Sequence, residues 1–301
     1  MTIIRKLKRQ QLDIAKYDRA IHEALNYRIY AESWYLDLLT DKKWECLIYG
    51  DYEVVMPIPL QYKFGFKFVT QPIFCQQLGV FYRKEIPEDL FRKFEKKLHQ
   101  YRVRAYHFNE ENTESFAPKG ELKTNHVLDI SLPYEQIRKK YNRNRRRKLI
   151  SLPDGYQLKL SDSVDDLVEL FQEEYPGLVK PKWIELHRQI LRVAFEKKIG
   201  YQCRIENEEG LVAGLFYIHT PRRIFQLGAG RKKAIPDIGF FTIIIDHTIR
   251  QFSNRPNYIF DFEGSMIPGV ALFNESFGAE RKTYINYSNI SLKRLFGFLD
   301  I

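Results

Sequence analysis

The sequence predicts a mixed α/β protein built from two similar halves. Its 301 residues suffice for two domains of ordinary size, at roughly 150 residues each. Hydrophobic residues make up 44% of the chain and charged residues 29%, a balance typical of a folded globular protein. In each half two helical segments precede a strand hairpin, a further strand, a helix and a final strand. This shared order favours an internal duplication.

The second half shows the order most clearly. Apolar residues at helical spacing predict helices over about 163–175 and 181–198. Segment 211–218 is too continuously apolar to be an exposed edge strand, and helix 238–252 is apolar on most of its surface and should be buried. The remaining elements are strands 201–205, 222–228, 258–262 and 282–287 and a short helix over about 268–276.

The first half repeats a shorter version of the same order. Its expected elements are helices 11–25, 33–40 and 88–100 and strands 44–49, 52–57, 103–108 and 125–130. The two hairpins align weakly, Trp44-x-Cys46 with Tyr201-x-Cys203 and Gln77-Leu-Gly79 with Gln226-Leu-Gly228. We therefore expect domains at 1–132 and 133–301.

Most of the net charge of +10 lies in one short segment. Residues 138–148 contain eight Arg or Lys and no acid, so the rest of the chain is nearly neutral. Pro133 can open a helix and Pro153-Asp-Gly155 stops it, so one basic helix over 134–150 is predicted to begin the second domain.

This basic segment suits more than one role. It can be a solvated connecting helix whose charge serves solubility, and a nuclear-localisation signal would look similar. Closely spaced cations can also contact a polyanion, since they release counterions from phosphates. The residues expected to make such contacts are Arg138, Arg143, Arg145, Arg146, Arg147 and Lys148.

Several classes of site are not supported. Three cysteines without Cys-x-x-Cys spacing predict neither a disulfide framework nor a zinc site, and the seven dispersed histidines predict no metal. The chain has no Walker loop, nucleophile elbow or dinucleotide fingerprint. It also has no apolar run of membrane-spanning length and no secretory apolar region, so a cytoplasmic protein without a membrane span is expected.

Segment 258–279 is the strongest candidate for chemistry. An apolar strand ends in Asp261-x-Glu263, whose carboxylates share one face because strand side chains alternate. Gly264-Ser265 then breaks the strand, and Pro268-Gly269 opens a helix. Carboxylates beside the free N–H groups of a helix N-terminus suit an anion or a carbonyl oxygen. From the residues alone, a strand-end cap followed by ordinary turn glycines explains the pattern equally well.

Two motifs in this segment resemble one family. Asp261-Phe-Glu-Gly264 is similar to the Asp-Phe-Gly-Gly strand end of Fem-type proteins, the tandem-domain aminoacyltransferase branch of the Gcn5-related N-acyltransferase (GNAT) superfamily. Gly269-Val-x-x-Phe273-x-x-x-Phe277-Gly278 resembles the Gly-x-x-x-Phe-x-x-x-Phe-Gly helix that follows in that branch. The basic helix resembles one that these proteins carry before their second domain. The similarity covers most of 134–287.

The resemblance implies two tandem GNAT-like domains, each a mixed, mostly antiparallel twisted sheet flanked by helices, the first of them degenerate. It also implies transfer of an acyl or aminoacyl group to an amine. Glu263 or Asp261 would then deprotonate the amine, and Tyr284, in the following strand, would protonate the leaving group or donate to the oxyanion. The residues expected to bind donor or substrate are Gly264, Ser265, Gly269, Phe273, Arg231, Lys232 and Lys233.

Two departures from the family affect the donor. Glu263 stands where the branch usually has glycine, and the superfamily's pyrophosphate loop is not intact between 229 and 237. Asp237 is expected to cap the following helix and to repel a phosphate there, so coenzyme A is not expected to bind in the usual manner. Fem-type relatives use aminoacyl-tRNA instead, which would give the basic helix a partner.

No cofactor is firmly implied, and acyl-CoA and aminoacyl-tRNA both stay open as donors. The resemblance suggests a small-molecule or cell-wall-precursor-like amine as acceptor. Two rivals stay open as well: a non-catalytic protein that binds tRNA or another nucleic acid on a degenerate acyltransferase fold, and a protein-interaction scaffold of the same fold.

Overall fold

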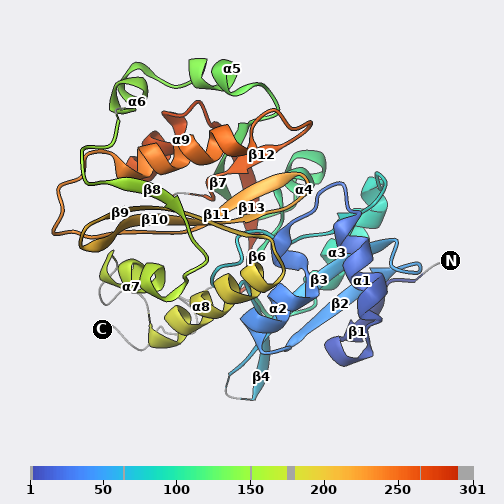
Figure 1. Cartoon of the computed structure of the whole chain (residues 1–301). Helices are drawn as coiled ribbons and strands as arrows, with labels where there is room; N and C mark the ends of the chain where they lie inside the picture. The colour runs from blue at the N-terminus through green and yellow to red at the C-terminus, as the bar shows by residue number, and fades with distance from the viewer. Residues whose placement is uncertain (1–2, 64, 150, 175–179, 265, 291–301) are drawn as a thin grey trace, which may run out of the picture. The chain divides into compact units, whose positions relative to one another are not determined.

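The computed structural model describes residues 3–63, 65–149, 151–174, 180–264 and 266–290 (Figure 1). Contacts divide the chain into two compact units. Unit 1 contains the chain up to Lys123 and again from Thr283, and unit 2 contains Thr124–Lys282. The chain crosses between units within β7 (Glu121–Asp129) and β13 (Glu280–Tyr287). The domain bounds expected from the sequence, 1–132 and 133–301, stay a prediction.

The sheet of unit 1 has the strand order β1-β2-β3-β4-β6-β13, and β5 pairs with β3. Every pair is antiparallel except β4–β6, which is parallel. The strands are β1 (Arg5–Lys8), β2 (Trp44–Tyr49), β3 (Val54–Lys63), β4 (Phe66–Thr70), β5 (Phe81–Tyr82) and β6 (Val103–His107).

The helices of unit 1 are η1 (Arg9–Gln11), α1 (Ile14–His22), η2 (Ile29–Ala31), α2 (Ser33–Thr40), α3 (Glu88–Leu98) and α4 (Glu110–Phe116). In α3 the apolar residues Leu90, Phe91, Phe94 and Leu98 recur at helical spacing and are all buried. Acids in the first turn of α3 and lysines in its last turn also match the helix dipole.

The sheet of unit 2 has the order β7-β12-β11-β10-β9-β8, and its one parallel pair is β11–β12. Its other strands are β8 (Gln157–Leu160), β9 (Gly200–Asn207), β10 (Gly210–His219), β11 (Arg223–Arg231) and β12 (Ile259–Asp261). Its helices are α5 (Tyr134–Lys139), α6 (Arg143–Lys148), α7 (Asp165–Glu174), α8 (Pro181–Glu196), α9 (Phe240–Phe252) and α10 (Pro268–Glu275).

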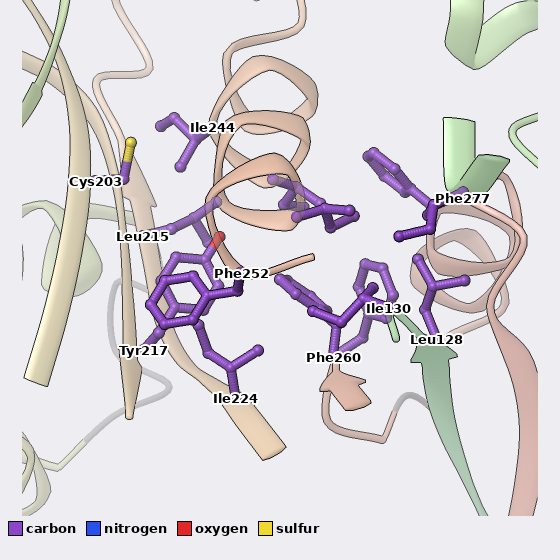
Figure 2. Close-up of a cluster of buried hydrophobic side chains, with 14 of the residues drawn as sticks. Leu128, Ile130, Cys203, Leu215, Tyr217, Ile224, Ile244, Phe252, Phe260 and Phe277 are labelled. Atoms are coloured by element: carbon purple, nitrogen blue, oxygen red, sulfur yellow. The ribbon is translucent and has the colours of Figure 1, made fainter. Parts of the chain in front are cut away.

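The core of unit 2 forms where α9 packs on the sheet (Figure 2). Ile244 and Phe252 of α9 belong to the same buried cluster as Leu215 and Tyr217 of β10 and Phe260 of β12. Full burial of one such side chain contributes roughly 1.5–3 kcal/mol. The predicted burial of this helix is confirmed.

The two units share one strand pattern. In each, three antiparallel pairs lead to one parallel pair and then to a last antiparallel strand. The helix that links the parallel strands is α3 in unit 1 and α9 in unit 2. The repeated order predicted from the sequence is therefore present in three dimensions.

The last strands of the two sheets are exchanged. β7 follows α4 of unit 1 along the chain but pairs with β12, whereas β13 follows α10 of unit 2 but pairs with β6. The sequence predicts both strands, yet it places strand 125–130 in the first half and strand 282–287 in the second. Local alternation of apolar residues identifies a strand but not its partner.

The basic segment forms two short helices, α5 and α6, where a single helix over 134–150 was predicted. Asn142 separates them because its side chain caps α6, accepting from Arg145 N at 2.8 Å. The backbone N–H of Asn142 donates to Ser276 O at 2.9 Å, which ties the break to the end of α10. Residue 150 lies outside the described residues.

In the part of the chain that the structure describes, no helix combines the length and the apolarity needed to cross a bilayer.

Candidate functional site

Asp261, the last residue of β12, is fully buried, and its carboxylate is held from three directions. Oδ2 lies 2.6 Å from a guanidinium nitrogen of Arg223, the first residue of β11. Oδ1 accepts from the side chain of Asn125 in β7 at 3.1 Å and from the backbone N–H of Glu263 at 2.9 Å. A buried charge is stable only when it is paired in this way. Asp261 thus joins β7, β11 and β12 and fixes the start of the turn after β12.

Glu263 follows in a left-handed backbone conformation, with φ of 61°. L-residues with a side chain rarely adopt this conformation, and glycine adopts it readily. The geometry therefore explains why glycine is usual here in the family that the sequence resembles. This chain instead carries a partly exposed carboxylate at a backbone position that disfavours it. Strained residues of this kind cluster at functional sites.

The ladder between β11 and β12 ends beside these carboxylates. The parallel ladder between β11 and β12 ends at Phe225–Asp261, while β11 continues to Arg231. Among the described residues, no bridge continues the ladder along this edge of β11. The edge from Gln226 onward therefore offers backbone donors and acceptors next to the turn that holds Glu263.

The turn and α10 contain the remaining predicted residues of this segment. Gly264 is exposed, and Ser265 lies outside the described residues. Gly269 is exposed in the first turn of α10, and a Cβ there would meet no atom within 4 Å, so packing does not require glycine. Phe273 is partly buried and lies under the guanidinium of Arg145, at 4.2 Å from its ring centre.

The sequence predicts Asp237 as the cap of α9; the N-cap residue is Gly239, and the carboxylate of Asp237 lies just before it, at the start of the helix. Asp237 Oδ1 accepts from Gly239 N at 2.8 Å and from Phe240 N at 3.3 Å. A carboxylate in this place occupies N–H groups that a phosphate would need and adds a like charge. This feature disfavours a pyrophosphate at the helix start.

The basic residues before α9 are arranged differently from the expectation. Strand β11 extends to Arg231 and not to 228, because residues 229–231 continue the antiparallel ladder with residues 213–215 of β10. Gly230 lies directly against the backbone of α7, where a Cβ would come within 2.8 Å of Phe171 N. Arg231 is partly buried and donates to Ile235 O at 3.4 Å. Lys232 is partly buried and Lys233 is exposed.

Comparison with known proteins gives no match among family models or curated proteins, but solved structures match over almost the whole chain. FemX matches with a TM-score of 0.66 at 10% identity, covering 98% of this chain and 99% of that one. The chain has a tandem GNAT fold of the Fem-like type. The fold class predicted from the sequence is confirmed.

Two further solved structures match this tandem GNAT fold. A tandem GNAT protein from the clavulanic acid biosynthesis pathway matches with a TM-score of 0.55 at 10% identity, over 97% of this chain and 99% of that one. L-PGS from Bacillus licheniformis matches with 0.52 at 12% identity, over 95% of this chain and 94% of that one. At these identities the likeness shows the fold alone.

Within the second GNAT-like unit, the cations of α5 and α6 divide into two groups. Arg138, Arg143, Arg146, Arg147 and Lys148 are exposed. Arg145 is 7% exposed, donates to Ser276 Oγ at 2.8 Å and to Thr242 Oγ1, and stacks on Phe273 and Phe277. Burial lowers the pKa of Arg145. The sequence groups Arg145 with the polyanion-binding residues, but its side chain is part of the packing between α6, α9 and α10.

Tyr284 belongs to the first GNAT-like unit, whereas Asp261 and Glu263 belong to the second. It is buried in β13 with its ring 5.4 Å from that of His107 in β6. His107 Nδ1 lies 2.7 Å from Gln76 O, and burial lowers the pKa of His107 to about 4. His107 is therefore neutral near pH 7.

Two sets of residues near the site are not evident from the sequence. Arg223 and Asn125 hold Asp261, and Glu275 of α10 lies 3.4 Å from Nε2 of the fully buried His126. Hydrogen bonding from Arg281 lowers the pKa of Glu275. These partners are far apart in sequence and depend on the register of β7 against β12, so no local pattern reveals them. Among the described residues, no cluster of His, Cys, Asp and Glu could hold a metal ion.

Proposed function

We propose that this protein transfers an acyl or aminoacyl group to an amine, and that the chemistry takes place in unit 2. One observation carries the proposal: the turn after β12 holds Glu263 at a positive φ beside the open edge of β11. A carboxylate occupies this position although the backbone favours glycine.

Each part of this edge has a chemical task. The amine must lose a proton as its nitrogen attacks the carbonyl carbon, and Glu263 accepts that proton as general base. The carbonyl oxygen becomes an oxyanion, which N–H groups along the edge of β11 stabilise. The C–N bond then forms fully, the bond to the leaving oxygen or sulfur breaks, and the proton passes to the leaving atom.

Asp261 takes a supporting role in this proposal. Its two oxygens already contact Arg223, Asn125 and Glu263 N, so it positions the turn and leaves the proton transfer to Glu263. The sequence leaves Glu263 and Asp261 as alternative bases, and the contacts of Asp261 favour Glu263. Tyr284, in unit 1, stays a prediction as proton donor.

Aminoacyl-tRNA is the donor that the charges of unit 2 favour. Asp237 at the start of α9 opposes the pyrophosphate of acyl-CoA. The exposed arginines of α6 (Arg143, Arg146 and Arg147) suit a phosphate backbone. In this case the leaving atom is the ester oxygen of the tRNA 3′ end.

Transfer from tRNA is tested directly with labelled substrate. Total tRNA charged with a mixture of radiolabelled amino acids is incubated with the protein and with peptides that carry a free lysine amine, and label in the peptide is counted. If Glu263 is the base, Glu263→Gln lowers turnover by roughly 10²–10⁴-fold. The control is Glu208→Gln, which changes an exposed acid in the β9–β10 turn. Equal turnover in Glu263→Gln and wild type would exclude the assignment.

The donor is tested separately by retention of uncharged tRNA at rising salt. In the triple variant Arg143→Gln, Arg146→Gln, Arg147→Gln, the slope of the logarithm of the binding constant against the logarithm of the salt concentration should become less steep. The decrease should be about 0.9 for each lost phosphate contact. Acetyl-CoA is the comparison ligand, and tighter binding of acetyl-CoA than of tRNA would reverse the choice of donor. Retention of tRNA without any transfer would favour the alternative function, a non-catalytic nucleic-acid-binding protein on this fold.

A further inference from the structure

Unit 1 carries a groove of about 470 Å³ that the proposed function does not use. Residues from β1, β2, the start of β4, the end of α3 and the segment before β6 line it; these elements can be followed in Figure 1. Its volume lies in the range of small-molecule sites, roughly 300–1,000 Å³.

The groove is strongly basic. Four cations line it, namely Lys6, Lys67, Lys97 and Arg102, and the described lining residues include no acid. Among the described residues, only Lys67 of these four cations has a carboxylate partner, since its Nζ lies 2.5 Å from Oε1 of the buried Glu45. Since Glu45 balances only one of the four charges, the groove keeps an excess of three positive charges.

Aromatic rings lie between these cations. Lys6 and Lys67 approach the ring of Tyr101, at 5.9 and 5.2 Å from its centre. The hydroxyl of Tyr101 donates to Glu45 Oε2 at 3.0 Å, which fixes the ring in place. The rim is formed by Phe66, which is 52% exposed and has the guanidinium of Arg102 at 4.4 Å from its ring centre.

The stacking on Phe66 restricts the conformations of the Arg102 side chain before a ligand binds. A guanidinium held against a ring loses less conformational freedom when it meets a ligand, and its N–H edge stays able to grip a phosphate with two hydrogen bonds. Lys6 and Lys97 add point charges from two other elements. Exposed aromatic faces beside such cations are typical of surfaces on which nucleic-acid bases stack.

We propose that this groove is a nucleotide site. The phosphate lies among Lys6, Lys97 and Arg102, and the base stacks on the ring of Phe66 or Tyr101. A concave site with cations on several sides suits a single phosphorylated molecule better than the flat surface of a membrane.

Isothermal titration of the whole protein with AMP tests this site, with adenosine and inorganic phosphate as partial ligands. AMP should bind at least about tenfold more tightly than either part, because each part loses one set of contacts. Arg102→Gln and, separately, Lys97→Gln should each weaken AMP binding by about tenfold. The control is Lys84→Gln, which changes an exposed lysine of unit 1 outside the groove and should bind AMP as the wild type does.

Other results would overturn the proposal. Inorganic phosphate that binds as tightly as AMP would show a general anion site without a role for the rings. An equal loss in the Lys84→Gln control would show nonspecific charge attraction. Retention on phosphatidylglycerol vesicles that depends on Arg102 and Lys97, without AMP binding, would assign the surface to a membrane. Lys97→Gln keeps the test valid if Arg102→Gln disturbs folding, which circular dichroism detects.

Discussion

The ends of β6 in unit 1 and β12 in unit 2 correspond in the repeated fold, yet they are used differently. Strand β6 ends in His107-Phe-Asn109 and leads directly into α4, whereas β12 ends in Asp261-Phe-Glu263 and leads through a turn into α10. In unit 1 the chain itself continues the ladder beyond β4, because Leu78 bridges Phe108 in parallel. In unit 2 the ladder of β12 with β11 ends at Asp261.

In unit 1, a buried network of polar side chains also lies at the end of β6. Arg28, which is 1% exposed, pairs with Glu110 at 3.0 Å and with Glu111 at 2.8 Å in the first turn of α4. Asn109 caps the same helix by accepting from Asn112 N at 2.9 Å. The groups that could contact a substrate in unit 1 therefore contact one another. At this point unit 1 pairs its polar groups with one another, whereas unit 2 keeps the open edge of β11 on which the proposed function depends.

The largest expected effect comes from the ion pair that supports the site of unit 2. Asp261→Asn leaves the buried Arg223 without its carboxylate, so the free energy of unfolding should fall by about 3–5 kcal/mol. Urea unfolding followed by circular dichroism measures it. The control Asp162→Asn changes an exposed acid of unit 2 and should stay within about 0.5 kcal/mol of wild type. An equally small effect of Asp261→Asn would mean that its carboxylate is not structural and could serve chemistry.

A smaller expected effect is a loss of stability at low pH, to which one buried histidine of each unit contributes. Burial lowers the pKa of His107 in unit 1 and of His187 in unit 2 to about 4, below the value of about 6.5 in an unfolded chain. The unfolded chain thus binds more protons between these values, so stability is complete above pH 6.5 and is lost as the pH falls toward 4. Each histidine should contribute on the order of 1–3 kcal/mol of that loss.

Urea unfolding at pH 7.5 and pH 4.5 measures this loss. His107→Asn and His187→Asn should each reduce the difference between the two pH values. A difference that neither substitution reduces would contradict the assignment of these protons.

The smallest expected effect is on the free energy of unfolding when glycine replaces the corresponding residues Glu263 and Asn109. The two substitutions should change it in opposite directions. Glu263→Gly should raise the free energy of unfolding by a few tenths to about 1 kcal/mol, since glycine accepts the positive φ, while transfer activity is lost. Asn109→Gly should lower the free energy of unfolding by at least a few tenths of a kcal/mol, because α4 loses its cap. Thermal unfolding of both variants measures the two signs, and stabilisation by Asn109→Gly would remove the contrast.

The sequence predicts the features of this molecule that depend on local pattern. The apolar helix that becomes α9, the carboxylate of Asp237 at its start and the repeated order of elements all follow from spacing and residue type. The cap by Asn142 is local, but the contact of Asn142 N with Ser276 O, which ties the break to α10, lies far along the chain and escapes prediction. The burial of Arg145 and the pairing of Asp261 with Arg223 escape it for the same reason. Charge alone could not separate Arg145 from its exposed neighbours.

The exchange of β7 and β13 has a consequence for synthesis on the ribosome. Strand β6 of unit 1 pairs with β13, so the sheet of unit 1 is incomplete until that late strand has emerged. At the usual elongation rate of about 5–20 residues per second, the wait between Lys123 and Thr283 lasts roughly 10–30 s. During that interval β6 is an edge strand of the nascent first unit, on the side that β13 later occupies.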